Sequence, residues 1–440
     1  MTKERADLII KGEYILTMTG GESLIINGAL AVRDKRILAV GREEEINSAY
    51  TADDTIGGKG KAVMPGFVNT HTHAAMVYFR GMADDLPLKV WLEEYIWPAE
   101  AKWLGEEFVG DATELACLEM IKAGITLYND MYFFEDASAE AVGRAGMRAV
   151  LASGILDFPS AAAGTRKEYL ERAEEFILRW RDDDLITPAV APHAPYTCSP
   201  DTYAMALEMA RKYDTPVHTH LCETEWEVEE IRKRYGRTPI EHLDAHGLLS
   251  GRMLAAHVVC PAEGEIEILA ERGVSVSHCL ESNLKLASGI APVVRMLNSG
   301  VNVTFGTDGA ASNNDLDIMS EMSTAAKLHK AVSGDPTALS ARTALMMATR
   351  WGAEALGLGD RVGSIQAGKL ADLIVIDINK PHLIPIYDIY SHLVYSARSS
   401  DVEDVIINGK LVLNGRKTTT LSAEAVFSKA RQWKDRIISP

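Results

Sequence analysis

The sequence lacks the features that mark membrane-spanning and secreted proteins. No apolar run approaches the roughly 20 residues that a transmembrane helix needs. Residues 1–7 contain neither the apolar stretch nor the small-residue cleavage pattern of a secretory signal. We therefore expect a soluble protein of the cytoplasm.

Cysteine is also scarce, and its pattern excludes two kinds of site. The five cysteines are widely spaced and form no Cys-x-x-Cys pair. An odd, scattered set supports neither a disulfide framework nor a thiolate zinc site. We expect reduced side chains in the core of the protein.

Basic residues are outnumbered by acidic ones. The 45 lysines and arginines stand against 62 aspartates and glutamates, which gives a formal charge of −17. Such a surface repels polyanions, so we expect neither nucleic acid nor an anionic membrane as a main partner.

The two ends of the chain resemble each other in composition. Residues 6–18, 24–32 and 36–41 read as short strands, with turn signals at Gly20-Gly21 and Asn27-Gly28. Residues 369–377 and 402–413, the latter broken by Asn408-Gly409, are again rich in β-branched residues. One small β domain assembled from both ends is the simplest interpretation.

Between the ends, β-rich runs alternate with stretches of helical composition such as 199–213 and 225–235. This alternation is typical of parallel βα units, and eight such units make a closed barrel. We predict an α/β fold, with a (β/α)₈ TIM-type barrel over 65–363 and a small β-sandwich domain from 1–64 plus 364–440. The eight predicted strands are 66–69, 125–129, 148–154, 187–192, 216–221, 253–259, 274–277 and 301–307.

Polar side chains fall at the C-terminal ends of these runs. In a barrel these ends share one rim, where the active sites of the fold lie. Side chains that are far apart in the sequence are therefore expected to converge there. They are His71, His73, His193, His220, His257, His278 and Asp308.

The first run ends in His71-Thr72-His73. Residues two apart on a strand point to the same side, so both imidazoles can reach one metal ion. Alone this pattern is weak, because such pairs occur by chance. Its position at the end of an apolar strand favours the metal interpretation.

Several segments resemble the amidohydrolase superfamily, metal-dependent hydrolases built on distorted (β/α)₈ barrels. The resemblance covers nearly the whole chain. It rests on Met64-Pro65-Gly66-Phe67-Val68-Asn69-Thr70-His71-Thr72-His73, Thr219-His220-Leu221-Cys222-Glu223, Ala255-Ala256-His257, Ser277-His278, Ser282-Asn283-Leu284-Lys285-Leu286, Gly306-Thr307-Asp308-Gly309-Ala310-Ala311-Ser312-Asn313-Asn314 and Gly368-Lys369-Leu370-Ala371-Asp372-Leu373.

The resemblance implies one divalent metal ion, Zn²⁺ or else Fe²⁺. The residue types agree, since imidazoles and a carboxylate suit these ions, and the lysine that bridges two metals in some relatives is absent after the fourth run. The implied ligands are His71, His73, His220 and Asp308. His218 lies on the same strand face as His220 and competes for the ligand position, but only His220 is followed by a glutamate three residues later.

The resemblance also implies catalytic roles. Glu223 is placed to move a proton from the attacking water to the substrate, and His257 to orient that water. Asp308, besides its ligand role, belongs to the same catalytic set. His278 fits a substrate-facing role or a structural one.

Within the superfamily, three segments resemble the 5'-methylthioadenosine/S-adenosylhomocysteine deaminases. They are 91–100, ending in Glu100, 191–196, containing His193, and 309–314, which follows the metal aspartate. By this resemblance Glu100 binds the ribose hydroxyls and His193 contacts the nucleoside. Trp91 stacks on the substrate or, alternatively, packs beneath the loop. Taken without the resemblance, Glu100 reads as an exposed helix charge.

One departure from that family concerns the tail of S-adenosylhomocysteine. The arginine that relatives carry after the third strand is replaced by Ser153, although Arg166 can supply a cation nearby. This favours 5'-methylthioadenosine, adenosine or 5'-deoxyadenosine as substrate over S-adenosylhomocysteine. The implied reaction is hydrolytic deamination of this small-molecule nucleoside, and the family implies a homo-oligomer.

Two alternatives remain open at this point. The same chemistry could act on another ring, such as guanine, cytosine or a chloro-s-triazine. The chain could instead be a binding protein that has lost catalysis, although the full set of ligands argues against this.

Overall fold

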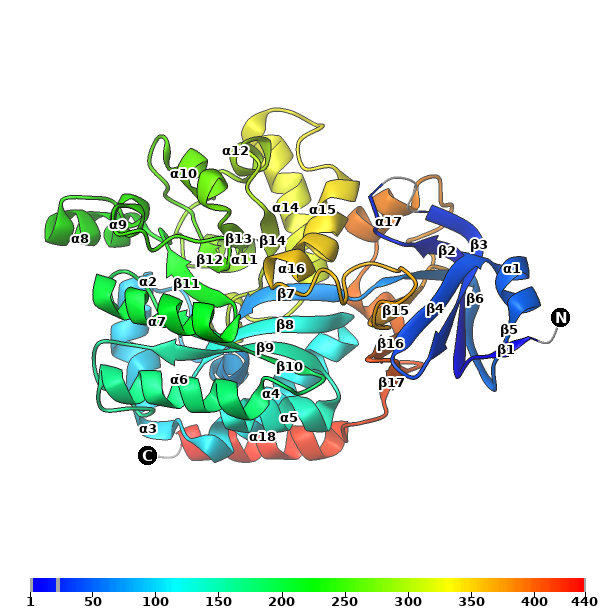
Figure 1. Cartoon of the computed structure of the whole chain (residues 1–440), viewed down its shortest axis with the longest axis horizontal. Helices are drawn as coiled ribbons and strands as arrows, with labels where there is room; N and C mark the ends of the chain where they lie inside the picture. The colour runs from blue at the N-terminus through cyan, green and yellow to red at the C-terminus, as the bar shows by residue number, and fades with distance from the viewer. Residues whose placement is uncertain (1–2, 21–23, 439–440) are drawn as a thin grey trace.

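The computed structural model describes residues 3–20 and 24–438, and it contains two eight-stranded sheets. One sheet is a parallel barrel surrounded by helices, and the other is a smaller, mainly antiparallel unit beside it (Figure 1). Both were expected from the sequence, and the predicted fold class is confirmed.

The barrel strands follow one another in sequence order, and every adjacent pair is parallel. The backbone N–H of Asp308, just after the last strand, donates to the carbonyl of His71 at 2.9 Å, which brings the last strand beside the first. The strands are β7 (Phe67–Thr72), β8 (Ile125–Tyr132), β9 (Arg148–Ile155), β10 (Ile186–Pro192), β11 (Val217–Leu221), β12 (Met253–His257), β13 (Ser275–His278) and β14 (Val303–Phe305). Each overlaps a predicted run.

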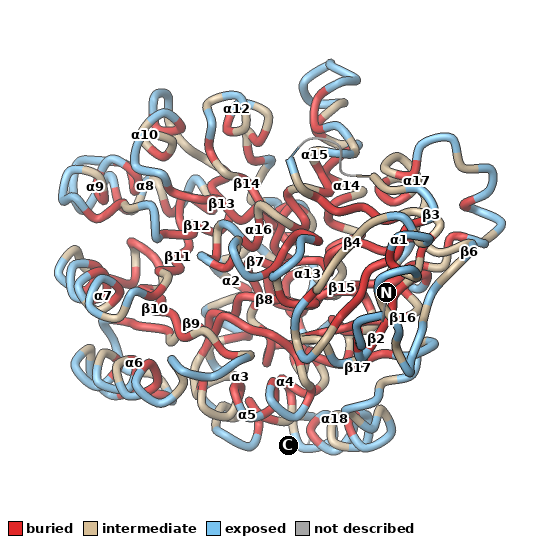
Figure 2. The backbone as a smooth tube through the Cα atoms, turned by 45° about the vertical axis from the view of Figure 1, so that its right-hand side comes forward, coloured by how far each residue is buried: buried red, intermediate tan, exposed pale blue. Residues whose placement is uncertain are grey.

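Helices surround the barrel, with their outer faces exposed and the strands buried within (Figure 2). They include the two predicted over 199–213 and 225–235. In order they are α4 (Glu106–Lys122), α5 (Glu135–Ala145), α6 (Arg166–Trp180), α7 (Pro200–Tyr213), α8 (Glu225–Tyr235), α9 (Pro239–Ala245), α10 (Glu265–Arg272), α11 (Leu280–Lys285), α12 (Val293–Asn298), α13 (Ala310–Asn313), α14 (Ile318–Ser333), α15 (Ala341–Met347) and α16 (Arg350–Ala355).

Local sequence signals explain where these helices begin and end. The hydroxyl of Ser199 accepts from the backbone N–H of Thr202 and caps α7, and Pro200 occupies its first turn. Thr224 caps α8 in the same way, and Gly236 ends that helix in the left-handed conformation, with φ 71°. The short connections between strands and helices thus place polar loops at the barrel rim.

A long connection between β7 and β8 crosses the rim. Before α4 it contains a 3₁₀ helix (Ala74–Phe79), α2 (Leu88–Val90), a π-helix (Trp91–Ile96) and α3 (Trp97–Trp103). The sequence did not reveal this arrangement. π-Helical turns are rare and often occur at functional sites.

The second sheet combines both ends of the chain in the order β18-β17-β16-β15-β6-β2-β3-β4. Its strands are β2 (Leu8–Leu16), β3 (Leu24–Arg33), β4 (Arg36–Arg42), β6 (Asp54–Pro65), β15 (Leu373–Asp377), β16 (Val402–Ile407), β17 (Lys410–Asn414) and β18 (Lys417–Thr418). Apolar side chains from β2 and β3 share one core with those of β15 and β16, so the sheet folds over on itself. We retain 1–64 plus 364–440 and 65–363 as the proposed domain boundaries.

Two details of the sequence interpretation were wrong in this sheet. Strand β6, which joins the N-terminal to the C-terminal strands, was not predicted; Gly57, Gly58 and Gly60 lie inside it, and glycine weakens the sequence pattern of a strand. Asn27-Gly28 is not a turn but lies inside β3, where Asn27 adopts φ 50°. The turn predicted at Gly20-Gly21 falls partly outside the described residues. The turn at Asn408-Gly409 is present, with φ 52° and 76°.

The two sheets meet where β6 passes into β7. At the bend, a side chain on Gly66 would come within 2.1 Å of Thr126, so only glycine fits. Nearby, the buried Arg148 Nε donates to Asp372 Oδ2 at 2.6 Å and ties the barrel to the terminal unit.

The remaining elements cover the outside of these sheets. They are the paired β1 (Glu4–Arg5) and β5 (Tyr50–Thr51), α1 (Glu43–Ala49), α17 (Ile389–Tyr395), a 3₁₀ helix (Ser399–Asp401) and α18 (Ala423–Ile438), which lies below the barrel beside α4 in Figure 1. Across residues 3–20 and 24–438, none of the helices combines the length and the apolar character needed to cross a bilayer. The five cysteines are free thiols, four of them buried.

Candidate active site

A cavity of about 340 Å³ opens at the C-terminal ends of the barrel strands. This volume suits a small organic ligand. Most of the predicted site residues line it, namely His73, Trp91, Glu100, His193, His220, Glu223, His257 and Asp308. His71 lies just beneath, with no exposed surface.

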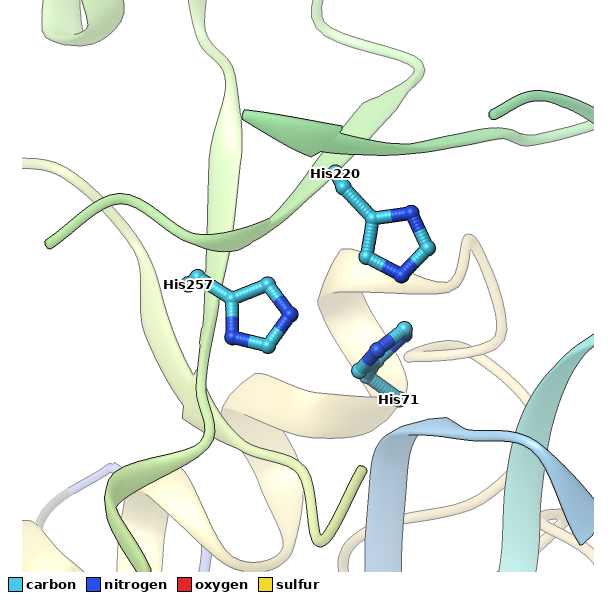
Figure 3. Close-up of side chains that lie close together, drawn as sticks. All are labelled: His71, His220 and His257. Carbon is cyan, nitrogen blue, oxygen red and sulfur yellow. The ribbon is translucent and has the colours of Figure 1, made fainter. Parts of the chain in front are cut away.

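Three imidazoles and one carboxylate converge at the base of the cavity. The Nε2 atoms of His71 and His73 each lie 3.3 Å from Oδ1 of Asp308, and Nε2 of His220 lies 3.3 Å from Nε2 of His73. Figure 3 shows the rings of His71, His220 and His257 facing a common space, and one nitrogen from each lies within 4.8 Å of the others.

This cluster fits a divalent metal ion. His71 Nε2 is fully buried and makes no hydrogen bond, which is costly for a polar atom unless a ligand partners it. Three nitrogens and one carboxylate oxygen are the donor set of a Zn²⁺-type site with room for water. His218 lies behind His71, with its Nε2 2.9 Å from His71 Nδ1, so the geometry favours His220 as the ligand.

Hydrogen bonds hold the carboxylate of Asp308 in place. The hydroxyls of Ser282 and Ser312 donate to its Oδ2 at 2.6 and 2.8 Å, and the backbone N–H of Gly309 donates to Oδ1 at 2.8 Å. Such partners orient a metal ligand and tune its charge. Sequence reasoning missed both serines, although each lies in a segment quoted for the family resemblance.

The backbone is strained where the strands end at this site. Cys222, His257 and Asp308 have φ of 51°, 75° and 59°, in the left-handed region that side chains other than glycine rarely adopt. Strain of this kind persists where the surrounding structure enforces it, commonly at active sites.

Burial sets the electrostatics of the cluster. Burial lowers the pKa of His71 to about 3 and holds the pKa of His220 well below its usual range, so both rings are neutral and have lone pairs to offer. Burial also acts to raise the pKa of Asp308, but the neighbouring histidines outweigh it and keep that pKa well below normal. Neutral imidazoles beside an ionised carboxylate are the protonation states that metal binding requires.

Glu223 and His257 lie next to each other in the cavity lining. His257 Nε2 lies 3.9 Å from Glu223 Oε2, and its Nδ1 donates to Asn283 Oδ1 at 2.9 Å, which fixes the ring. Burial raises the pKa of Glu223 above its ordinary value, and the neighbouring His257 opposes the shift. Glu227 accepts the backbone N–H of Glu223 at 2.8 Å and holds this segment in place. Asn283 and Glu227 were not predicted.

The far end of the cavity is formed by the connection between β7 and β8. Glu100, on α3, accepts a hydrogen bond from the hydroxyl of Tyr132 at 2.7 Å. Burial raises the pKa of Glu100 to about 7, although this hydrogen bond opposes the shift. Trp91 is buried at the start of the π-helix and lines the cavity, and His193 Nδ1 lies 2.9 Å from the hydroxyl of Thr197.

Two residues singled out in the sequence lie elsewhere. Arg166 is not among the described residues that line the cavity, and its guanidinium lies 3.5 and 3.4 Å from the hydroxyls of Ser199 and Thr202. His278 is buried outside the cavity, and its Nε2 lies 3.0 Å from His329 Nε2. The structure thus gives His278 a packing position.

Known proteins resemble this chain over its whole length. The model of the amidohydrolase family matches residues 62–412. The chain is 52% identical to a 5-methylthioadenosine/S-adenosylhomocysteine deaminase of Thermodesulfovibrio yellowstonii, over 98% of each chain. It is 45% identical to a 5'-deoxyadenosine deaminase of Methanosarcina acetivorans, over 99% of each chain.

A solved structure is also similar to this chain over nearly its whole length. An adenosine deaminase from Xanthomonas campestris with bound zinc has a TM-score of 0.97 and 45% identity, and the match covers 99% of each chain. The likeness therefore includes both the barrel and the terminal unit.

Proposed function

The chain belongs to the amidohydrolase family, and we propose that it deaminates an adenine nucleoside by hydrolysis, with the inosine analogue and ammonia as products. The relatives named as deaminases of 5-methylthioadenosine, 5'-deoxyadenosine and adenosine support this assignment. The observation that supports this function most directly is one cavity with a metal-type cluster at its base and the half-buried Glu100 at its far end.

The proposed metal ligands are His71, His73, His220 and Asp308. The zinc in the Xanthomonas relative supports Zn²⁺ as the ion. When bound, such an ion lowers the pKa of a water molecule to near neutrality and so supplies the nucleophile. All further steps are the work of the side chains around it.

Two side chains guide the attack on C6 of the purine ring. His257, fixed by Asn283, hydrogen-bonds the incoming oxygen. Glu223 takes the proton of the attacking water and passes it to N1 of the ring, which lets the amino group leave as ammonia after a second proton transfer. The raised pKa of Glu223 suits this shuttle, because the group must both accept and release a proton.

The far end of the cavity selects the sugar. The Glu100 carboxylate accepts hydrogen bonds from the ribose hydroxyls, which separates nucleosides from free bases. His193 contacts the nucleoside, and Trp91 provides an aromatic wall.

The cavity also limits the 5' substituent. None of the described residues that line it is a lysine or an arginine, while Leu156, Phe158 and Pro159 make part of the wall apolar. A carboxylate or phosphate at the 5' end would meet no cation there. The preferred substrates are therefore 5'-methylthioadenosine, 5'-deoxyadenosine and adenosine rather than S-adenosylhomocysteine.

The ultraviolet absorbance change on deamination tests the proposal directly. Zinc-loaded protein is mixed with each of these nucleosides, with S-adenosylhomocysteine and with guanine as comparison substrates. We expect rapid turnover of the three uncharged nucleosides and slow turnover of the others. Absence of turnover for every adenine nucleoside would overturn the proposed function.

A further inference from the structure

A buried carboxylate lies behind the two serines that hold Asp308. Glu321, on α14, has no exposed surface, and the charged neighbours that influence it, Glu281 and Asp315, are both acidic. Burying a carboxylate without a cation is costly unless hydrogen-bond donors surround it. The hydrogen bonds of Glu321 therefore indicate why it is there.

The Glu321 carboxylate joins two segments of the chain. Its Oε1 accepts a hydrogen bond from the side-chain amide of Asn313, at the end of α13, at 3.0 Å. Both of its oxygens lie 3.3 Å from the backbone nitrogen of Glu281, in the first turn of α11. The same Asn313 nitrogen also donates to the carbonyl of Thr307 at 2.8 Å. Because that nitrogen faces two acceptors and a backbone N–H can only donate, the direction of every one of these hydrogen bonds is fixed.

Helix α14 also holds the side chain of Glu281. The hydroxyls of Ser320 and Thr324, on the same helix as Glu321, donate to Oε1 of Glu281 at 2.8 and 2.6 Å. The first turn of α11 is thus attached to α14 through both the backbone and the side chain of one residue.

The two residues that Glu321 holds are each adjacent in sequence to a serine that binds Asp308. Ser282 comes directly after the first of them, and Ser312 comes directly before the second. Both serines are buried, and their hydroxyls donate to Oδ2 of Asp308 at 2.6 and 2.8 Å. A shift of either segment would therefore move a hydroxyl away from the carboxylate.

We propose that Glu321 is a positioning residue of the metal site, which ties the start of α11 to the end of α13 and so keeps the hydroxyls of Ser282 and Ser312 directed at Asp308. A carboxylate suits this position because its two oxygens can accept from both segments at once. The inference rests on the ligand set of the proposed function. In it, Glu321 acts on Asp308 only through the two serines.

A double-mutant cycle separates this role from a general contribution to stability. Glu321→Leu removes the acceptor, and Asn313→Ala, a milder change at a half-buried position, removes one of its two partners. Each change is made in the wild type and in the Ser282→Ala/Ser312→Ala protein. The measured quantity is the dissociation constant of Zn²⁺, obtained by competition with a chelating dye, which does not depend on turnover.

In the wild-type background we expect Glu321→Leu to weaken zinc binding by about tenfold or more, the usual cost of losing a partner behind a metal ligand. In the protein without the two serine hydroxyls, the same change should alter the dissociation constant by less than about twofold, because no hydroxyl is left to position. Asn313→Ala should show the same dependence on background.

Glu265→Leu is the matched control. Glu265 is only 1% exposed and accepts hydrogen bonds from the hydroxyl of Thr238 and the backbone N–H of Glu241. Neither Glu265 nor these partners belong to the described lining of the cavity. Loss of this buried carboxylate should lower the melting temperature and leave zinc affinity unchanged.

Equal losses of zinc affinity in the two backgrounds would overturn the inference, because Glu321 would then act independently of the serines. Wild-type affinity in a folded Glu321→Leu protein would overturn it as well. Where Glu321→Leu does not fold, Asn313→Ala is judged by the same two results. A protein that shows the expected affinities but deaminates no nucleoside would refute the proposed function and leave this inference standing.

Discussion

The two ends of the cavity are built on different principles. At the base, the functional side chains extend from the ends of barrel strands, and hydrogen bonds from neighbouring residues fix them, as Ser282 and Ser312 fix Asp308. At the far end, Trp91 and Glu100 come from short helical turns in one long connection between β7 and β8. A rigid base suits chemistry shared by a whole family, and a variable connection suits the choice of substrate.

This contrast predicts that changes at the base mainly reduce the rate, while changes at the far end mainly alter recognition. Losses in kcat with an unchanged KM belong to the first kind, and losses that depend on the sugar belong to the second. The following variants test the division, from the largest expected effect to the smallest.

Glu223→Gln should produce the largest loss. The amide cannot carry the proton from water to the ring, so we expect kcat to fall by about 10²- to 10⁴-fold, the usual contribution of a positioned acid–base group. Zinc content, measured in the same preparation, should stay at the wild-type level. Glu229→Gln, an exposed change on the following helix α8, is the control. A Glu223→Gln enzyme with near-normal kcat would remove Glu223 from the mechanism.

Glu100→Gln should affect recognition of the sugar instead. A hydrogen bond to a charged group contributes about 1.5–3 kcal/mol, so we expect kcat/KM for adenosine to fall by about 10- to 100-fold. The decisive measurement compares adenosine with 2'-deoxyadenosine, because the wild-type preference for ribose should shrink in the variant. Glu94→Gln, exposed on the same connection, should leave that preference intact. An unchanged preference in Glu100→Gln would mean that Glu100 does not bind the ribose.

The same contrast explains what could be predicted from the sequence. The C-terminal ends of all barrel strands lie on the same rim. The proximity of His71, His73 and Asp308 could therefore be predicted from their positions at strand ends alone. The partners behind them, such as Ser282 and Ser312 behind Asp308, depend on side-chain directions after folding, and no local pattern records these.

The far end of the cavity was predicted less completely. Glu100 and Trp91 were found only through family resemblance, since neither a lone glutamate nor a tryptophan carries a spacing signal. Arg166 was placed near the substrate because of its position in the sequence, but the fold turns it toward Ser199. Strand β6 was missed; its glycines weaken the sequence pattern of a strand, while its pairing with β2 and β15 stabilises it as a strand.

Because the pKa of Glu100 is raised, substrate binding at the far end of the cavity should depend on pH. Below about pH 7 the carboxyl is protonated and accepts ribose hydroxyls less well, so KM for adenosine should rise as the pH falls from 8 to 6. The Glu100→Gln enzyme should lack this change. The contribution of Glu100 to the free energy of unfolding should change in the opposite direction: it falls as the pH rises, whereas substrate binding improves. The folded-state pKa lies above the unfolded value, so this group stabilises the fold most at low pH, and its contribution is lost as the pH rises through 7.

Melting temperatures of the wild type and Glu100→Gln between pH 5 and 8 measure that second trend. The difference between the two proteins should shift in favour of the glutamine variant as the pH rises, because the variant never buries a charge. A difference that is constant across this range would contradict the raised pKa.

The smallest effect is expected from Ser312→Ala, at the base. The change removes one hydrogen bond to Asp308 Oδ2, while the shorter one from Ser282, at 2.6 Å, remains. A single hydrogen bond contributes about 0.5–1.5 kcal/mol, which corresponds to a weakening of zinc binding of about two- to tenfold. The ribose preference should not change, because Ser312 lies outside the described lining of the cavity. If Ser312→Ala altered the choice between adenosine and 2'-deoxyadenosine, the base and the far end would be coupled, and the division between rate and recognition would fail.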